Sequence, residues 1–184
     1  MHGEFSGNPK TMWLSDRGDD RDMQVIEDFW YRDHAGRRWD VPAGTVINGA
    51  SIPRTLWSSV GSPYTGNYRR AALVHDATVG REGVLRSESD AMFYFACLAG
   101  GCSQLQAKML YAGVRLGAWA SDKHLLSMEA AAPTQDATRL PGEQTPRELE
   151  LRARYTLIAN QLKATSNNFA DIENVVDRNL GAAD

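Results

Sequence analysis

His75 and Asp76 stand side by side in a stretch typical of a helix, and Asp90 lies near the start of the next helical stretch. A histidine among small and apolar residues is partly desolvated, so its ring N–H needs a partner. Antiparallel packing of the two helices would bring the Asp90 carboxylate opposite His75. Such a pair can activate water or a hydroxyl group. We therefore take His75 as a candidate catalytic base and Asp90 as the carboxylate that orients it.

A second group of polar residues lies in the segment 48–54, Asn-Gly-Ala-Ser-Ile-Pro-Arg. Gly49 permits an unusual backbone angle and Pro53 fixes the exit direction, so the segment is expected to form a rigid bend. With His75 nearby, Ser51 is a candidate nucleophile. The candidate substrate-binding residues are Asn48, Arg54 and Asp76.

Each assignment has a structural alternative. Ser51 or Asn48 would cap the turn that follows the bend. His75 would be a buried, hydrogen-bonded structural residue, with Asp90 completing a capping box begun at Ser87.

A metal site is the third interpretation. His75, Asp76 and Asp90 offer one imidazole and two carboxylates, enough for a divalent ion with open positions. The sequence has no paired motif such as His-Glu-x-x-His, so we expect no cofactor and keep the divalent ion as an alternative.

The elements that must position these residues change along the chain. Residues 23–31 have the composition of a strand, residues 33–36 that of a turn, and residues 38–42 that of the returning strand. Residues 45–47 add a short β segment. Helices are expected over 68–79, from Ser87 to the pair Gly100-Gly101, and from about Ser103.

The C-terminal part has a different pattern. Thr145, Pro146 and Glu148 form a strong helix start, and apolar residues then follow at heptad spacing, interrupted only at Thr165. These patterns predict an α+β fold: a small antiparallel β-sheet on a three-helix layer, plus a long C-terminal amphipathic helix. The expected parts are a core domain over 1–127, a linker over 128–144 and the heptad helix over 145–184, which packs on its own domain, on a copy of itself or on another partner.

Composition excludes several classes of protein. The 184 residues include 42% hydrophobic and 23% charged residues, as in globular proteins, and the net charge of −3 argues against binding to nucleic acid. The sequence shows neither a membrane span nor a secretory signal, so we expect synthesis in the host cytoplasm. Cys97 and Cys102 are expected to be small buried hydrophobes.

Several strings resemble a family of tailed phages, prophages and bacteria, the domain-of-unknown-function family 1353. They are Val41–Val46, Asn48–Arg54, Ala71–Asp76, Arg86 and Asp90–Phe93. The family usually has Asp in place of Asn48 and a Leu-Tyr pair in place of Thr78-Val79. The His-Asp pair followed by Asp-x-x-Phe also resembles secreted phospholipases of the A2 type, although the disulfides and calcium loop of those enzymes are missing.

Three functions follow from the residues and the resemblance. The first is a small phage hydrolase acting on a cell-envelope substrate, carried in the virion or tail. The second is a non-catalytic virion or tail protein that assembles with phage structural proteins or with itself through residues 145–184. The third is an accessory protein that binds a host or phage protein.

Overall fold

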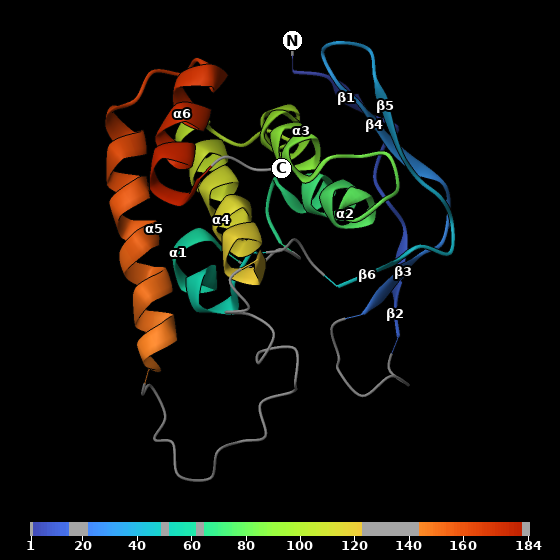
Figure 1. The fold of residues 1–184 in the computed structure, drawn as a ribbon. Coiled ribbons are helices and arrows are strands. Elements are labelled where there is room, and N and C mark those ends of the chain that lie inside the picture. The colour runs from blue at the N-terminus through green and yellow to red at the C-terminus, as the bar shows by residue number, and fades with distance from the viewer. Residues whose placement is uncertain (1, 15–21, 49–51, 62–64, 123–143, 182–184) are drawn as a thin grey trace, which may run out of the picture.

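The computed structural model describes residues 2–14, 22–48, 52–61, 65–122 and 144–181, apart from the side chain of Arg54. The fold is α+β, as the sequence patterns predict (Figure 1). Strands cover one side of helices α2 (Arg69–Thr78) and α3 (Arg86–Ala99). Helix α4 (Gln104–Asp122) packs on the other side of α3. No helix in the described segments is long and apolar enough to cross a membrane.

The strands form two antiparallel sheets of three strands each. The first has the order β1 (Glu4–Phe5), β4 (Phe29–Arg32) and β5 (Arg38–Val41). The second has the order β2 (Thr11–Trp13), β3 (Met23–Val25) and β6 (Val46–Ile47).

The expectation of one strand over residues 23–31 is wrong, because β3 and β4 belong to different sheets. Residues 26–28 between them are exposed. The Asp28 carboxylate accepts a hydrogen bond from the backbone N–H of Ala43, which holds the chain where it changes sheet. The expected turn after β4 is present, and the Asp33 carboxylate accepts the N–H groups of Ala35 and Arg37 there.

The three helices expected before residue 127 are confirmed, with one correction. Helix α3 begins at Arg86, with Leu85 in the N-cap position, so the capping box expected from Ser87 and Asp90 is wrong. Asp90 lies inside the helix and its side chain is fully buried. A short 3-10 helix η1 (Arg54–Leu56) and helix α1 (Trp57–Val60) precede α2.

The expected single C-terminal helix is two helices, α5 (Pro146–Ala164) and α6 (Phe169–Leu180). The backbone is extended at Thr165, and Asn168 starts α6 by accepting the N–H of Ala170. Lys108 of α4 donates to the backbone oxygen of Thr165 over 2.7 Å, at the carbonyl end of α5. The heptad pattern does not reveal the break at Thr165, because Leu162 and Phe169 on either side of it are seven residues apart and so continue the seven-residue repeat.

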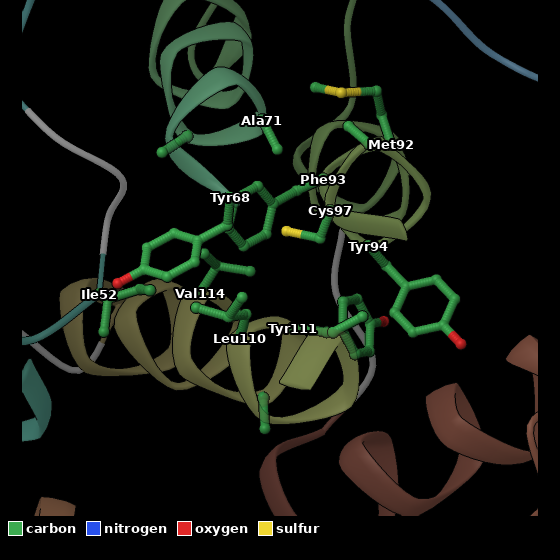
Figure 2. Packing of buried hydrophobic residues seen from close by; sticks show 14 of the residues in the cluster. Ile52, Tyr68, Ala71, Met92, Phe93, Tyr94, Cys97, Leu110, Tyr111 and Val114 are labelled. Carbon is green, nitrogen blue, oxygen red and sulfur yellow. The ribbon is translucent and has the colours of Figure 1, made fainter. Parts of the chain in front are cut away.

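One hydrophobic core joins both sheets and the helices. Apolar residues from both sheets, from α2, α3 and α4, and from α5 and α6 belong to one buried cluster. Figure 2 shows its centre, where Phe93 and Cys97 of α3 point toward Tyr68 and toward the α4 residues Leu110 and Val114. Both cysteines are buried, as expected. The core fixes the spacing of α2, α3 and α4, and these helices carry the polar residues described next.

Candidate functional site

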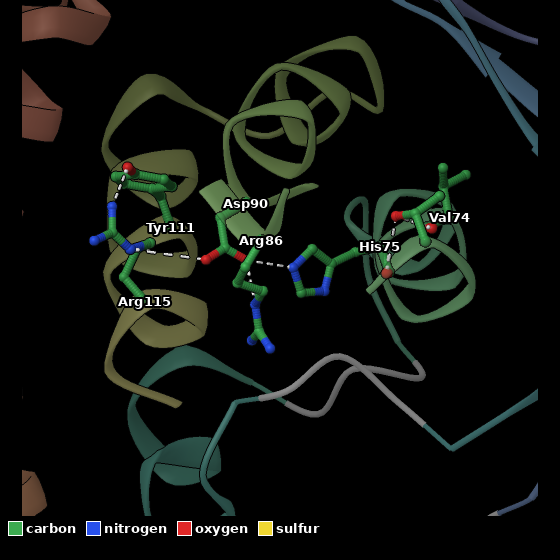
Figure 3. Close-up of polar contacts among 7 residues, drawn as sticks. Val74, His75, Arg86, Asp90, Tyr111 and Arg115 are labelled. Atoms are coloured by element: carbon green, nitrogen blue, oxygen red, sulfur yellow. Dashed lines mark hydrogen bonds and ion pairs between the residues drawn. The ribbon is translucent and has the colours of Figure 1, made fainter. Parts of the chain in front are cut away.

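His75 and Asp90 contact each other in the interior of the protein. His75 comes from the middle of α2 and Asp90 from the second turn of α3. The His75 Nε2 atom lies 2.7 Å from Asp90 Oδ1, and neither side chain is exposed at all. The predicted contact between the imidazole and the acid is therefore confirmed, and their catalytic roles remain a prediction (Figure 3).

Two guanidinium groups also contact the Asp90 carboxylate. Arg86, one turn earlier on α3, donates from Nε to Oδ1 over 3.1 Å. Arg115 of α4 places Nε 3.7 Å from Oδ2. An ionised carboxylate in a protein interior needs such partners because burial removes its hydration. Arg86 and Arg115 are such partners of Asp90.

Hydrogen-bond chemistry assigns the proton on His75. An ionised carboxylate only accepts hydrogen bonds, so it needs Nε2 as the donor, and a neutral imidazole that donates from Nε2 has its lone pair on Nδ1. The Nδ1 atom is buried and has no hydrogen-bond partner in the described part of the chain. The Phe93 ring packs beside the imidazole, with 5.0 Å between ring centroids.

Arg115 continues the network toward the C-terminal helices. Its Nη1 donates to the Tyr111 hydroxyl over 3.0 Å, and its Nη2 lies 2.9 Å from Asp177 Oδ1 on α6. Burial by itself lowers the pKa of Arg115, but Tyr111, Asp177 and Asp90 together raise that pKa above its ordinary value. Burial also raises the pKa of Tyr111, so its hydroxyl stays protonated.

The other predicted site residues separate into two groups. The Asp76 carboxylate accepts the backbone N–H of Asn48 over 2.6 Å, and this bond ties the end of β6 to α2. Adjacent helical residues point about 100° apart, which is why Asp76 serves β6 while His75 faces α3. Ser51 and the side chain of Arg54 lie outside the described residues.

The metal alternative gains no support from the geometry. Among the described residues, no group of three or more His, Cys, Asp or Glu side chains could hold a metal ion. Asp90 is instead bonded to His75 and Arg86, whose nitrogen atoms occupy its Oδ1 oxygen.

The comparisons with known proteins concern the part of the chain that carries the pair. Residues 23–114, half of the chain, match the family described as "Protein of unknown function (DUF1353)". The chain belongs to the DUF1353 family. The resemblance seen in the sequence motifs is thereby confirmed, and the family description assigns no activity to this DUF1353 chain.

Two relatives come from Sinorhizobium fredii. Uncharacterized protein y4jT is 34% identical over 110 residues, which are 59% of this chain and 32% of the relative. Uncharacterized protein y4iH is 37% identical over 97 residues, which are 53% of this chain and 41% of the relative. The chain thus spans about a third to two fifths of the length of these relatives. No solved structure matches the chain.

The DUF1353 segment contains His75, Arg86 and Asp90, whereas Arg115 and Asp177 follow it. Sequence reasoning from the residues assigned no role to these arginines or to Asp177. The contact of Arg86 with Asp90 could have been predicted from the local sequence, since side chains four residues apart meet on a helix. The sequence indicates the role of Arg115 more weakly: a single cation between the apolar residues Val114 and Leu116 suggests a buried charge that needs a partner. Nothing local connects Asp177 to this site.

Proposed function

We propose that this DUF1353 chain is a small hydrolase in which His75 is the general base and Asp90 orients it. The observation that carries the proposal is the state of the buried imidazole. One ring nitrogen is bonded to the Asp90 carboxyl group, and the other has no partner in the described part of the chain. Buried polar atoms of purely structural residues are nearly always hydrogen-bonded. An acceptor held without a partner is what a general base requires.

The chemistry follows from the order of the bonds. His75 Nδ1 accepts a proton from water, or from a hydroxyl group such as that of Ser51. Asp90 stabilises the resulting imidazolium through Nε2 and holds the ring in one orientation. Arg86 and Arg115 supply positive charge beside Asp90, and Arg86 also has a buried Nη2 atom without a hydrogen-bond partner among the described residues. Asn48, Arg54 and Asp76 are proposed to contact the substrate.

The proposal requires that water and substrate reach an imidazole that is fully buried in this structure. A hydrolysis assay therefore tests whether substrate reaches His75 as well as whether His75 acts as a base. The proposed substrate belongs to the cell envelope, either wall polymer or lipid, in keeping with the phage context that the sequence motifs imply. On this proposal the protein is made in the host cytoplasm and carried in the virion.

The alternative, assembly through residues 145–184 without catalysis, has less support. The heptad residues that would form such an interface are buried within the protein, in contact with its other helices. They include Leu151, Tyr155, Ile158, Leu162, Ile172 and Val176. A partner bound to α5 would meet its outer side, where Leu149 and Leu157 are about half exposed. Binding to phage proteins or to a second copy remains a prediction for that surface.

The decisive experiment compares wild type and His75→Ala on purified cell wall and on lipid vesicles. Each is assayed with a chelator and with added Ca²⁺ or Zn²⁺. We expect His75→Ala to lower the hydrolysis rate by about a hundredfold or more, the usual effect of losing a general base. His34→Ala is the matched control, because His34 is exposed on the β4–β5 turn. Equal rates for His75→Ala and wild type, or no hydrolysis by wild type on either substrate, would contradict the proposal.

A further inference from the structure

Arg115 joins the His75–Asp90 pair to a helix outside the DUF1353 segment. Its side chain is 4% exposed, and its guanidinium lies between two carboxylates, with Nε toward Asp90 and Nη2 toward Asp177 of α6. Nη2 also donates to the backbone oxygen of Gly181, just after α6, over 3.3 Å. Figure 3 shows Arg115 and Tyr111 on one side of Asp90 and His75 on the other. Arg115 thus connects α6 to the carboxylate that contacts His75.

Apart from His75, the charged side chains of this network are two of each sign. Arg86 of α3 and Arg115 of α4 carry two positive charges, and Asp90 and Asp177 carry two negative charges. Asp76, the next residue after His75 on α2, carries a further negative charge and is bonded to the backbone N–H of Asn48. Because the interior screens charges poorly, removing one member leaves a net charge that acts on the imidazole.

We propose that Arg115 is a positioning residue of the His75–Asp90 site and that Asp177 of α6 balances its charge, so that the C-terminal helices are part of the site. The positioning role of Arg115 in catalysis rests on the proposed function, whereas its electrostatic effect on His75 does not. Without Asp177, the positive charge of Arg115 acts on the Asp90 carboxylate alone, which weakens the bond between Asp90 and His75. Without Arg115, Asp90 keeps only Arg86 as a cation, and Asp177 loses the cation it contacts.

The proposal predicts effects of opposite sign. Asp177→Asn leaves two cations against one anion, which disfavours a protonated imidazole and moves the pH midpoint of the His75 titration down. Arg115→Gln leaves two anions against one cation and moves that midpoint up. Each displacement is expected to be about half a pH unit or more, given the low effective dielectric of a buried site. A purely structural role would give no such reversal of sign.

The test uses the full-length protein with isotope-labelled histidine and follows the ring signals of His75 by NMR from pH 5 to 9. Asp171→Asn is the matched control, because Asp171 is also on α6 but is exposed and bonded to Ser166. Arg115→Lys, which restores the charge, should return the midpoint toward wild type. If Arg115→Gln does not fold, the partly exposed Asp177 still gives a decisive variant. Midpoints in folded Asp177→Asn that match those of Asp171→Asn would overturn the proposal.

Hydrolysis by the same variants separates this inference from the proposed function. A displaced midpoint together with an inactive wild type would support the coupling of His75 to α6 and contradict the proposed hydrolase activity. An unchanged midpoint, together with loss of hydrolysis in His75→Ala, would support the proposed hydrolase activity and contradict the coupling of His75 to α6.

Discussion

At the scale of single residues, Asp90 decides the character of the site. The same residue could have capped a helix or paired with His75, and these roles need different positions on α3. The helix begins at Arg86, so Asp90 points into the interior and not at the free N–H groups of the first turn. Its oxygens lie near one imidazole and two guanidinium groups. A charge buried this way is held by its partners, which makes the network sensitive to loss of any one of them.

Asp90→Asn should therefore be strongly destabilising. The amide keeps the size of the side chain but leaves Arg86 and Arg115 facing a neutral group. Breaking a buried ion pair from one side costs about 3–5 kcal/mol, and urea unfolding measures the change in free energy of unfolding.

Asp40→Asn is the control, since Asp40 makes an exposed ion pair with Arg38 and its loss should cost less than about 1 kcal/mol. Similar losses for the two variants would show that burial does not set the strength of the Asp90 network.

At the scale of elements, the start of α5 shows how local sequence fixes a helix end. Thr145 accepts the N–H of Glu148, and the Glu148 carboxylate accepts the N–H of Thr145. Pro146 occupies the first helical turn, where it sacrifices no internal hydrogen bond. The structure confirms this predicted capping box. The local sequence could predict it because all its bonds lie within four residues. The break between α5 and α6 depends in addition on Lys108, which is distant in sequence.

Thr145→Ala should lower the free energy of unfolding by about 1 kcal/mol, because the N–H of Glu148 at the start of α5 loses the Thr145 hydroxyl that accepts it. Thermal unfolding followed by circular dichroism measures the effect.

Thr156→Ala makes the same change within α5, at an exposed residue whose hydroxyl bonds only to the preceding turn. We expect that control to be neutral within about 0.5 kcal/mol. An equal loss at both positions would mean that the capping box adds nothing to stability.

At the scale of the whole molecule, α4 is the element that unites the chain. It contacts α3 on one side and α5 and α6 on the other. Its residues Lys108, Tyr111 and Arg115 also make the polar contacts to the C-terminal helices or to the site. The apolar side of α5 is therefore part of the protein's own core, and removal of residues 145–184 would expose that core.

Ile158→Ala should lower the free energy of unfolding by about 2–5 kcal/mol, the usual cost of a cavity at a fully buried aliphatic residue. The neighbouring Leu157→Ala is the matched control, because Leu157 is 55% exposed and its loss should cost less than about 0.5 kcal/mol.

Urea unfolding of both variants distinguishes the two sides of α5. A larger loss for Leu157→Ala would contradict packing of the heptad residues on α4 and would favour assembly through the outer side.

The sequence by itself determined the features that depend on near neighbours. These include the α+β class, the positions of α2, α3 and α4, the capping box of α5 and the burial of both cysteines. It also pointed to the contact between His75 and Asp90, since two successive helices commonly pack antiparallel. Only the tertiary structure decided that residues 23–31 divide between two sheets and that the C-terminal helices close on α4. It alone placed Arg115 between Asp90 and Asp177, because a buried charge finds its partner through the packing of distant segments, which local periodicity does not encode.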